Sequence, residues 1–130
     1  MKQKTNLMIT NQKGFTLIEI IAVLVILGLL AVVAVPKYID LQAQAAQKSA
    51  DGVWGAANSA VSLNFANGIL NPAGSTPIAT AADLVGAMES TPQGWTASGT
   101  TLTDSSGTYV ITITAAEVEG STRAVLTKSW

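Results

Sequence analysis

The feature that most constrains this chain of 130 residues is a long apolar run from Phe15 to Val35. A helix of that length, at about 1.5 Å of rise per residue, crosses a membrane hydrocarbon core of about 30 Å. One carboxylate, Glu19, lies inside the run. An ionised side chain at membrane depth is costly and usually has a functional partner. The run therefore predicts a membrane-spanning helix that carries an unusual charge close to its start.

Charges are distributed unevenly on the two sides of this run. Lys2, Lys4 and Lys13 precede it without any acid, whereas all eight acids of the chain follow residue 14. The positive-inside rule then predicts a cytoplasmic N-terminus and a translocated C-terminal part. Because the acidic remainder lacks clustered Lys and Arg, we expect no nucleic-acid partner.

The chain contains neither cysteine nor histidine. Their absence excludes disulfides, thiolate and imidazole metal ligands, and catalysis by Cys or His. No motif of paired carboxylates is visible, and Lys128 is the only lysine of the predicted β region. We therefore expect no enzyme activity, no cofactor and no metal site.

Two ordinary interpretations of the apolar run leave observations unexplained. A secretory signal peptide has an apolar core of about 7–15 residues before a small-residue cleavage site, and residues 32–34 (VVA) could serve as that site. This run is longer, however, and Glu19 interrupts it. A plain single-span anchor fits the length but explains neither Glu19 nor the Gly14-Phe15 junction.

A third interpretation rests on residues 13–19, KGFTLIE. This segment resembles the class III signal of type IV prepilins, in which a basic leader ends in Gly, Phe follows, and Glu is the fifth residue of the mature chain. Gly28 and Pro36 also follow at the spacing familiar in this family. The resemblance covers about residues 1–65, and residues 37–42 (KYIDLQ) look most like the mannose-sensitive haemagglutinin type of pilin.

The resemblance implies a processing pathway and a function. A prepilin peptidase would remove a leader of residues 1–14 by cutting between Gly14 and Phe15, and would methylate the new amine of Phe15. The precursor would lie in the inner membrane, with its C-terminal domain periplasmic or extracellular. An inner-membrane platform would then assemble it into a homo-oligomeric surface filament. The alternative within the family is a type II secretion pseudopilin that forms a periplasmic piston.

Within this family Glu19 is expected to act in filament assembly. Its carboxylate would pair with the Phe15 amine of a neighbouring subunit or of its own chain, which offsets the desolvation of both charges. The alternative is that Glu19, one turn from the helix start, reaches the polar interface of the membrane.

Gly28 and Pro36 mark a second feature of the apolar helix. Proline removes a backbone hydrogen bond, and glycine lowers helix propensity by about 1 kcal/mol relative to Ala. The resemblance implies that this segment gives up helix in the filament, whereas an ordinary kinked membrane helix is the open alternative.

The family also suggests a calcium site near the C-terminus, for which Asp104, Glu117 and Glu119 are the candidates. Their spacing matches no calcium-binding loop, so we interpret them as solvated acids.

The remainder, residues 37–130, is expected to be an amphipathic helix with a small globular domain. Helical periodicity continues beyond Pro36 and predicts one helix over about residues 15–66 that stops at Asn67-Gly68, with Trp54 and Phe65 as core anchors. The stripe that carries this periodicity comprises Ile39, Ala43, Ala46, Ala50, Val53, Trp54, Ala57, Ala60, Val61 and Phe65.

The last half of the chain predicts a loop, a short helix and a sheet. Residues 67–80 form the loop, and a capping box at Thr80 and Asp83 opens a helix that runs to about Glu89. After a turn at residues 91–94 the period becomes two, which indicates three or four short antiparallel strands, with a hairpin turn at residues 104–107. The fold class is therefore α+β, the ladle of the pilin family. With no cysteine available, packing, with Trp130 as a candidate, is expected to secure the last strand.

Overall fold

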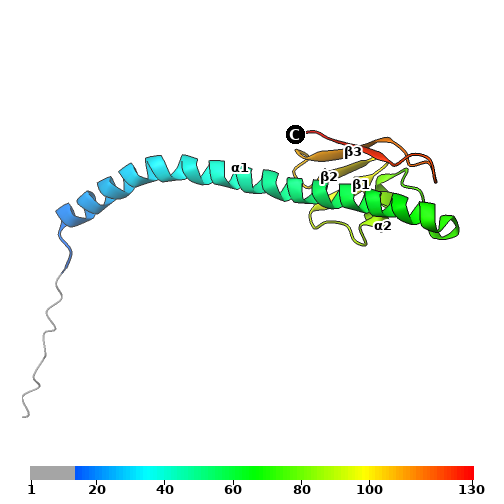
Figure 1. Ribbon diagram of the computed structural model, residues 1–130. Coiled ribbons are helices and arrows are strands. Elements are labelled where there is room, and N and C mark those ends of the chain that lie inside the picture. The colour runs from blue at the N-terminus through cyan, green and yellow to red at the C-terminus, as the bar shows by residue number, and fades with distance from the viewer. Residues whose placement is uncertain (1–13) are drawn as a thin grey trace, which may run out of the picture. The chain divides into compact units, whose positions relative to one another are not determined.

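The computed structural model describes residues 14–130, so the predicted leader lies, apart from Gly14, outside the described residues. The chain divides after Leu41 into two compact units. The elements, shown in Figure 1, are helix α1 (Leu17–Leu70), the 3₁₀ turn η1 (Pro72–Gly74), helix α2 (Ala81–Ala87) and strands β1 (Trp95–Ser98), β2 (Thr101–Asp104), β3 (Val110–Ala115) and β4 (Val125–Lys128). The predicted α+β layout of a long N-terminal helix and a small antiparallel sheet is confirmed.

Helix α1 is continuous over 54 residues and contains Pro36 in its interior. The predicted stop at Asn67-Gly68 is wrong, because the Asn67 carbonyl still accepts a hydrogen bond from the Asn71 N–H at 2.7 Å. Gly68 is buried, and a Cβ built on it would lie 3.0 Å from Ser75 Oγ. Gly68 therefore does not end α1 but allows the segment around Ser75 to pack closely against the helix.

Helix α2 begins with the predicted capping box. The Thr80 hydroxyl accepts a hydrogen bond from the Asp83 N–H at 3.3 Å, and Asp83 Oδ2 accepts one from the Thr80 N–H at 2.8 Å. The helix ends at Ala87, earlier than predicted, and Glu89 has a left-handed φ of 66°. That conformation is incompatible with continuing a right-handed helix, which explains the shorter element.

The four strands form one antiparallel sheet in the order β1-β2-β3-β4. The predicted turn at residues 104–107 joins β2 to β3, and Gly107 there has a φ of 74°. The turn between β1 and β2 was not predicted; Gly99, with a φ of 54°, makes it possible. Strands β1 and β4 are the two edges of the sheet.

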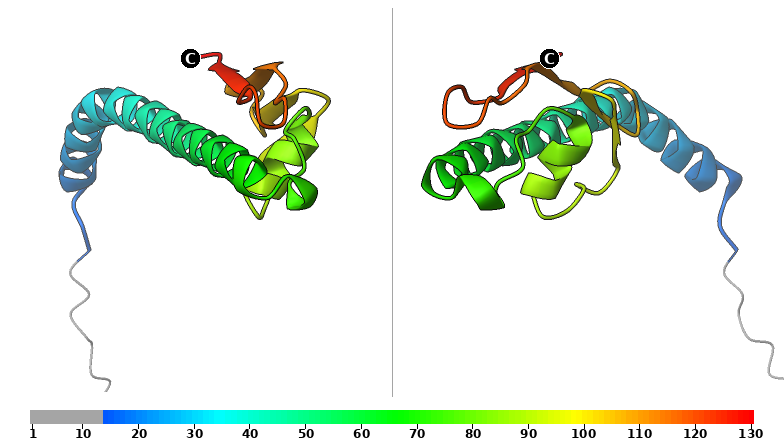
Figure 2. Two further views of the ribbon diagram at one scale, coloured as in Figure 1. Left: turned by 45° about the vertical axis from the view of Figure 1, so that its right-hand side comes forward. Right: turned by 90° about the vertical axis from the view of Figure 1, so that its right-hand side faces the viewer.

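The core of the second unit lies between the sheet, α2 and the C-terminal half of α1. Figure 2 shows how these elements are arranged. Trp54 packs against this core as predicted, whereas Phe65 is half-buried and lies outside the cluster, so its prediction as a core anchor is wrong. The buried cluster comprises Ala57, Val61, Ile78, Ala81, Leu84, Leu102, Ile111, Ile113 and Ala124.

Candidate functional site

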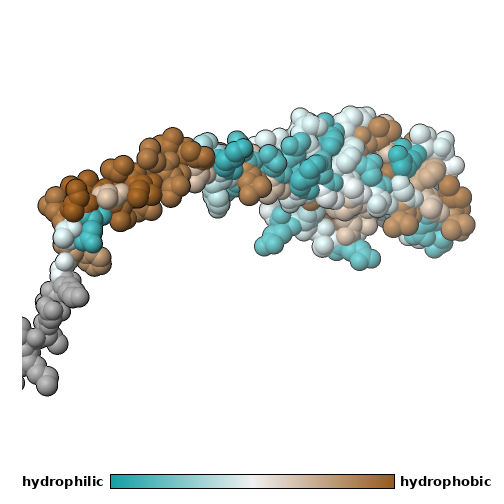
Figure 3. Space-filling model, turned by 60° about the vertical axis from the view of Figure 1, so that its left-hand side comes forward, coloured by the Kyte–Doolittle hydropathy of each residue, from teal (hydrophilic) through white to brown (hydrophobic). Residues whose placement is uncertain are grey.

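The first half of α1 exposes a continuous apolar surface. Its large hydrophobic side chains are about half or more exposed, with Leu17 at 77%, and Phe15 just before the helix is 83% exposed. Figure 3 shows this surface as the brown stretch of the helix. By length and composition α1 could cross a membrane. An apolar area this large marks a surface that contacts lipid or another protein.

Glu19 lies in the first turn of this helix and is part of a capping box. Its Oε2 accepts hydrogen bonds from the Thr16 N–H and the Thr16 hydroxyl, both at 2.8 Å, and the Thr16 hydroxyl accepts one from the Glu19 N–H at 3.3 Å. Thr16 is therefore the residue that caps α1, and the helix starts at Leu17. The T-x-x-E signal for this cap is visible in the sequence, although the cap at Thr16 was not predicted.

The predicted cleavage junction lies just outside the helix. Gly14 and Phe15 have no regular secondary structure and are exposed. Phe15 and Glu19 line one shallow hollow of the helix start, together with Ile20, Val23 and Leu24. Phe15 and Glu19, the two residues predicted to act in filament assembly, therefore lie close together. Their roles in assembly stay predictions.

Gly28 and Pro36 lie within unbroken helix. A Cβ built on Gly28 would contact nothing within 4 Å, so no close approach inside the chain requires this glycine. The proposed loss of helix between the two residues stays a prediction.

A second cluster of charged and aromatic side chains surrounds Asp51 on α1. Asp51 Oδ1 lies 3.0 Å from Lys128 Nζ and accepts a hydrogen bond from Trp130 Nε1, also at 3.0 Å. Its Oδ2 lies 3.3 Å from Lys48 Nζ. The Trp130 indole, followed by the Lys128 ammonium, lowers the pKa of Asp51 from 3.8 to about 2. Trp130 was predicted to secure the last strand by packing; its hydrogen bond to Asp51 was missed.

Two of the acids considered for calcium, Glu117 and Asp104, accept hydrogen bonds from other residues of the second unit. Glu117 is 6% exposed, and its Oε2 accepts hydrogen bonds from Asn64 Nδ2 at 3.1 Å and from the Ile78 N–H at 3.4 Å. The prediction that Glu117 is a solvated acid is therefore wrong. Asp104 Oδ1 accepts a hydrogen bond from the Tyr109 N–H at 2.8 Å in the turn before β3. The pKa of Asp104 is lowered, mainly by the hydrogen bond from the Ser106 hydroxyl and also by backbone hydrogen bonds from residues that include Tyr109 and Ser106.

Comparison with known proteins finds similarity in the N-terminal part of the chain. Residues 9–35 match the family model described as "Prokaryotic N-terminal methylation motif". The chain is 47% identical over 51 residues to the "Type IV narrow pilus major component PilA5" of Thermus thermophilus. These residues are 39% of this chain and 44% of that protein. It is 37% identical over 75 residues to "Fimbrial protein EcpC" of Eikenella corrodens, covering 58% of this chain and 49% of that protein.

A third relative is a "Fimbrial protein" of Moraxella nonliquefaciens, 42% identical over 57 residues, which are 44% of this chain and 37% of the relative. The chain thus matches less than half the length of each of these relatives. No solved structure matches the chain. The resemblance of residues 13–19 to the type IV prepilin signal is confirmed by the family model and by these relatives.

Proposed function

Because the chain carries the N-terminal methylation motif and is homologous in its N-terminal part to type IV pilins and fimbrial proteins, we propose that it is a structural subunit of a helical pilus-like filament. The observation that carries the proposal is the exposed apolar half of α1, which begins beside Gly14-Phe15 and contains Glu19. Lipid buries such a surface before assembly, and the apolar helices of other copies bury it in a filament.

Processing precedes assembly in this proposal. A prepilin peptidase removes the leader, residues 1–14, and methylates the new N-terminal Phe15. The family model supports this step because its match, residues 9–35, spans both sides of the junction. The precursor lies in the inner membrane with a cytoplasmic N-terminus through residues 15–36, and residues 37–130 lie on the other side. An assembly platform in that membrane builds the filament.

Glu19 has two roles in this proposal. Within its own chain it caps α1, but its partner in the cap, Thr16, is neutral, so the cap itself supplies no opposite charge. A buried charge needs an opposite charge. The ammonium of Phe15 in another copy supplies that charge when the leader has been removed, so pairing selects the correctly docked subunit.

Two substitutions separate the cap from the charge pair. Glu19→Gln keeps an acceptor that serves in a capping box but removes the charge. Thr16→Ala removes the capping hydroxyl, which lowers helix stability by about 1 kcal/mol, and keeps the charge. We expect Glu19→Gln to be inserted and processed but to yield few filaments, whereas Thr16→Ala assembles. Sheared surface filaments are compared with total membrane protein, and mass spectrometry identifies the N-terminal residue and its methylation.

The opposite ranking of the two variants would show that Glu19 acts only as a cap. An intact leader on the mature wild-type protein would contradict the pilin proposal itself. Surface filaments absent from the wild type, despite correct processing, would favour the pseudopilin alternative.

A further inference from the structure

Strand β4 has little apolar pattern to fix its position on the sheet. It is an edge strand of four residues and pairs only with β3. Leu126 is its one half-buried apolar side chain, and Val125 is 47% exposed. The pairing also shifts register between Ile113 and Ala115 of β3. Because a buried apolar face is what usually specifies register, β4 needs another determinant.

Lys128 lies on the inner face of this edge strand. It is paired with Ile111, which is 1% exposed, and directly opposed residues share one face of a sheet. Only 32% of the Lys128 side chain is exposed, and its ammonium lies 5.9 Å and 5.0 Å from the ring centroids of Trp54 and Trp130. This ammonium is partly exposed to solvent, and Asp51 Oδ1, 3.0 Å away, is the anion that pairs with it.

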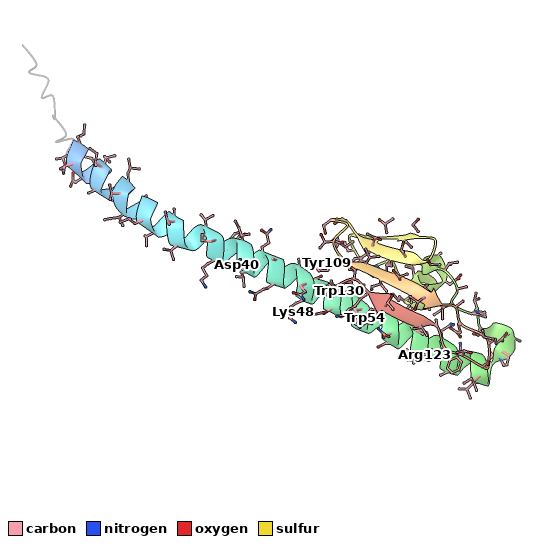
Figure 4. The ribbon with its side chains drawn as sticks, turned by 90° about the horizontal axis from the view of Figure 1, so that it is seen from above. Asp40, Lys48, Trp54, Tyr109, Arg123 and Trp130 are labelled. Atoms are coloured by element: carbon pink, nitrogen blue, oxygen red, sulfur yellow. The ribbon has the colours of Figure 1, made fainter. Side chains whose placement is uncertain are left out.

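Trp130 reaches the same carboxylate oxygen from two residues further along the chain. Its Nε1 donates to Asp51 Oδ1. Its ring packs edge-on against Tyr109, with centroids 5.4 Å apart, and lies 6.5 Å from Trp95. Figure 4 labels Trp54 on α1, with Trp130 and Tyr109 next to the same part of the helix. One acidic side chain of α1 thus holds both β4 and the residue that ends the described chain.

We propose that Asp51 fixes the register of β4, both on the sheet and against α1. A slip of one residue turns Lys128 to the outer face. A slip of two residues moves it by about 6.6 Å, which is more than the reach of an ion pair. Within residues 14–130, either slip leaves Lys48, whose side chain is 80% exposed, as the only cation paired with Asp51. Only the observed register satisfies Asp51, Lys128 and Trp130 together.

Engineered cysteines test this proposal in the full-length chain in membranes, because the chain has no cysteine of its own. Thr112→Cys with Thr127→Cys joins two residues that are paired in the observed register. Thr112→Cys with Ser129→Cys joins two residues that become paired only after a slip of two. After mild oxidation, the mass of the linked peptides identifies the bond within one chain, and a non-reducing gel detects links between chains.

We expect the native pair to cross-link and the slipped pair to stay reduced when Asp51 is present. Asp51→Ala should lower the yield of the native cross-link and produce the slipped one. Alanine is a good helix former, so α1 is not weakened by the change itself. Asp40→Ala is the matched control, since Asp40 is an exposed acid of the same helix, and it should leave both yields unchanged.

Two further variants decide the question if Asp51→Ala does not accumulate. Lys128→Met keeps an unbranched apolar stem beside the two tryptophans, and Trp130→Phe keeps an aromatic ring without its N–H. Each removes one of the two contacts with Asp51 and should also produce the slipped cross-link. A native cross-link that remains the predominant product in Asp51→Ala, or in both of these variants, would overturn the proposal.

Discussion

Leu102 offers the most direct test of how the second unit is held together. Its side chain is fully buried in the cluster that joins β2 to α1 and α2. Leu→Ala in a packed core lowers the free energy of unfolding by about 2–5 kcal/mol, because the transfer free energy of the removed atoms is lost and a cavity remains. The matched control is Leu63→Ala on α1, since the Leu63 side chain is 71% exposed.

The expected size of the effect follows from the size of the unit. We expect residues 37–130 to fold without the apolar half of α1, because the compact second unit begins at Gln42. A body of this length has a free energy of unfolding of about 5–14 kcal/mol. A loss of about 3 kcal/mol from Leu102→Ala then lowers its Tm by about 12–24 °C. Leu63→Ala should change the free energy of unfolding by less than about 0.5 kcal/mol.

Thermal unfolding followed by circular dichroism measures both variants in residues 37–130. The packing argument is refuted if Leu102→Ala changes the free energy of unfolding by less than about 1 kcal/mol. It is equally refuted if Leu63→Ala is as destabilising as Leu102→Ala. A fragment that is insoluble or lacks a cooperative transition would show that the second unit does not fold alone.

Two other predictions use the same fragment. Gly52→Ala should raise the free energy of unfolding by about 1 kcal/mol, because Gly52 is exposed inside α1 and a Cβ there would have nothing within 4 Å. Gly68→Ala is the control and should not give this gain, because its Cβ would lie 3.0 Å from Ser75 Oγ. Asp51 has its pKa lowered from 3.8 to about 2, so its contacts stabilise the folded body above about pH 4 and are lost as the pH falls through about 2. Thermal unfolding across this range should show a weaker acid dependence in Asp51→Asn, and an unchanged dependence would contradict the assigned contacts.

Local and periodic patterns in the sequence predict most of the secondary structure. The capping box at Thr80 places the start of α2, and the change to a period of two places the sheet. The end of α1 was misplaced because Asn67-Gly68 is a local stop signal, whereas the close approach of Ser75 to Gly68 is a tertiary requirement. A local rule cannot distinguish a glycine that ends a helix from a glycine that lets another segment approach it.

Contacts between distant polar residues could not be predicted. Asp51 is 77 residues from Lys128 and 79 from Trp130, and Glu117 is 53 residues from Asn64. A single acidic residue carries no periodic signal, so the sequence does not indicate whether it faces solvent or a partner. Glu19 could be singled out as a candidate because the surrounding apolar run makes one carboxylate conspicuous, and its role in assembly stays a prediction.

The cap at Thr16 also determines the backbone conformation at the proposed cleavage junction. An N-cap residue has non-helical dihedral angles, so helical structure does not propagate from Leu17 back into residues 14 and 15. The Gly14–Phe15 peptide bond therefore has none of the intrahelical hydrogen bonds that a peptidase would have to break before it could reach the carbonyl carbon. If the leader is removed at this bond, the Thr16 side chain that caps α1 also keeps the cleavage site out of helical structure.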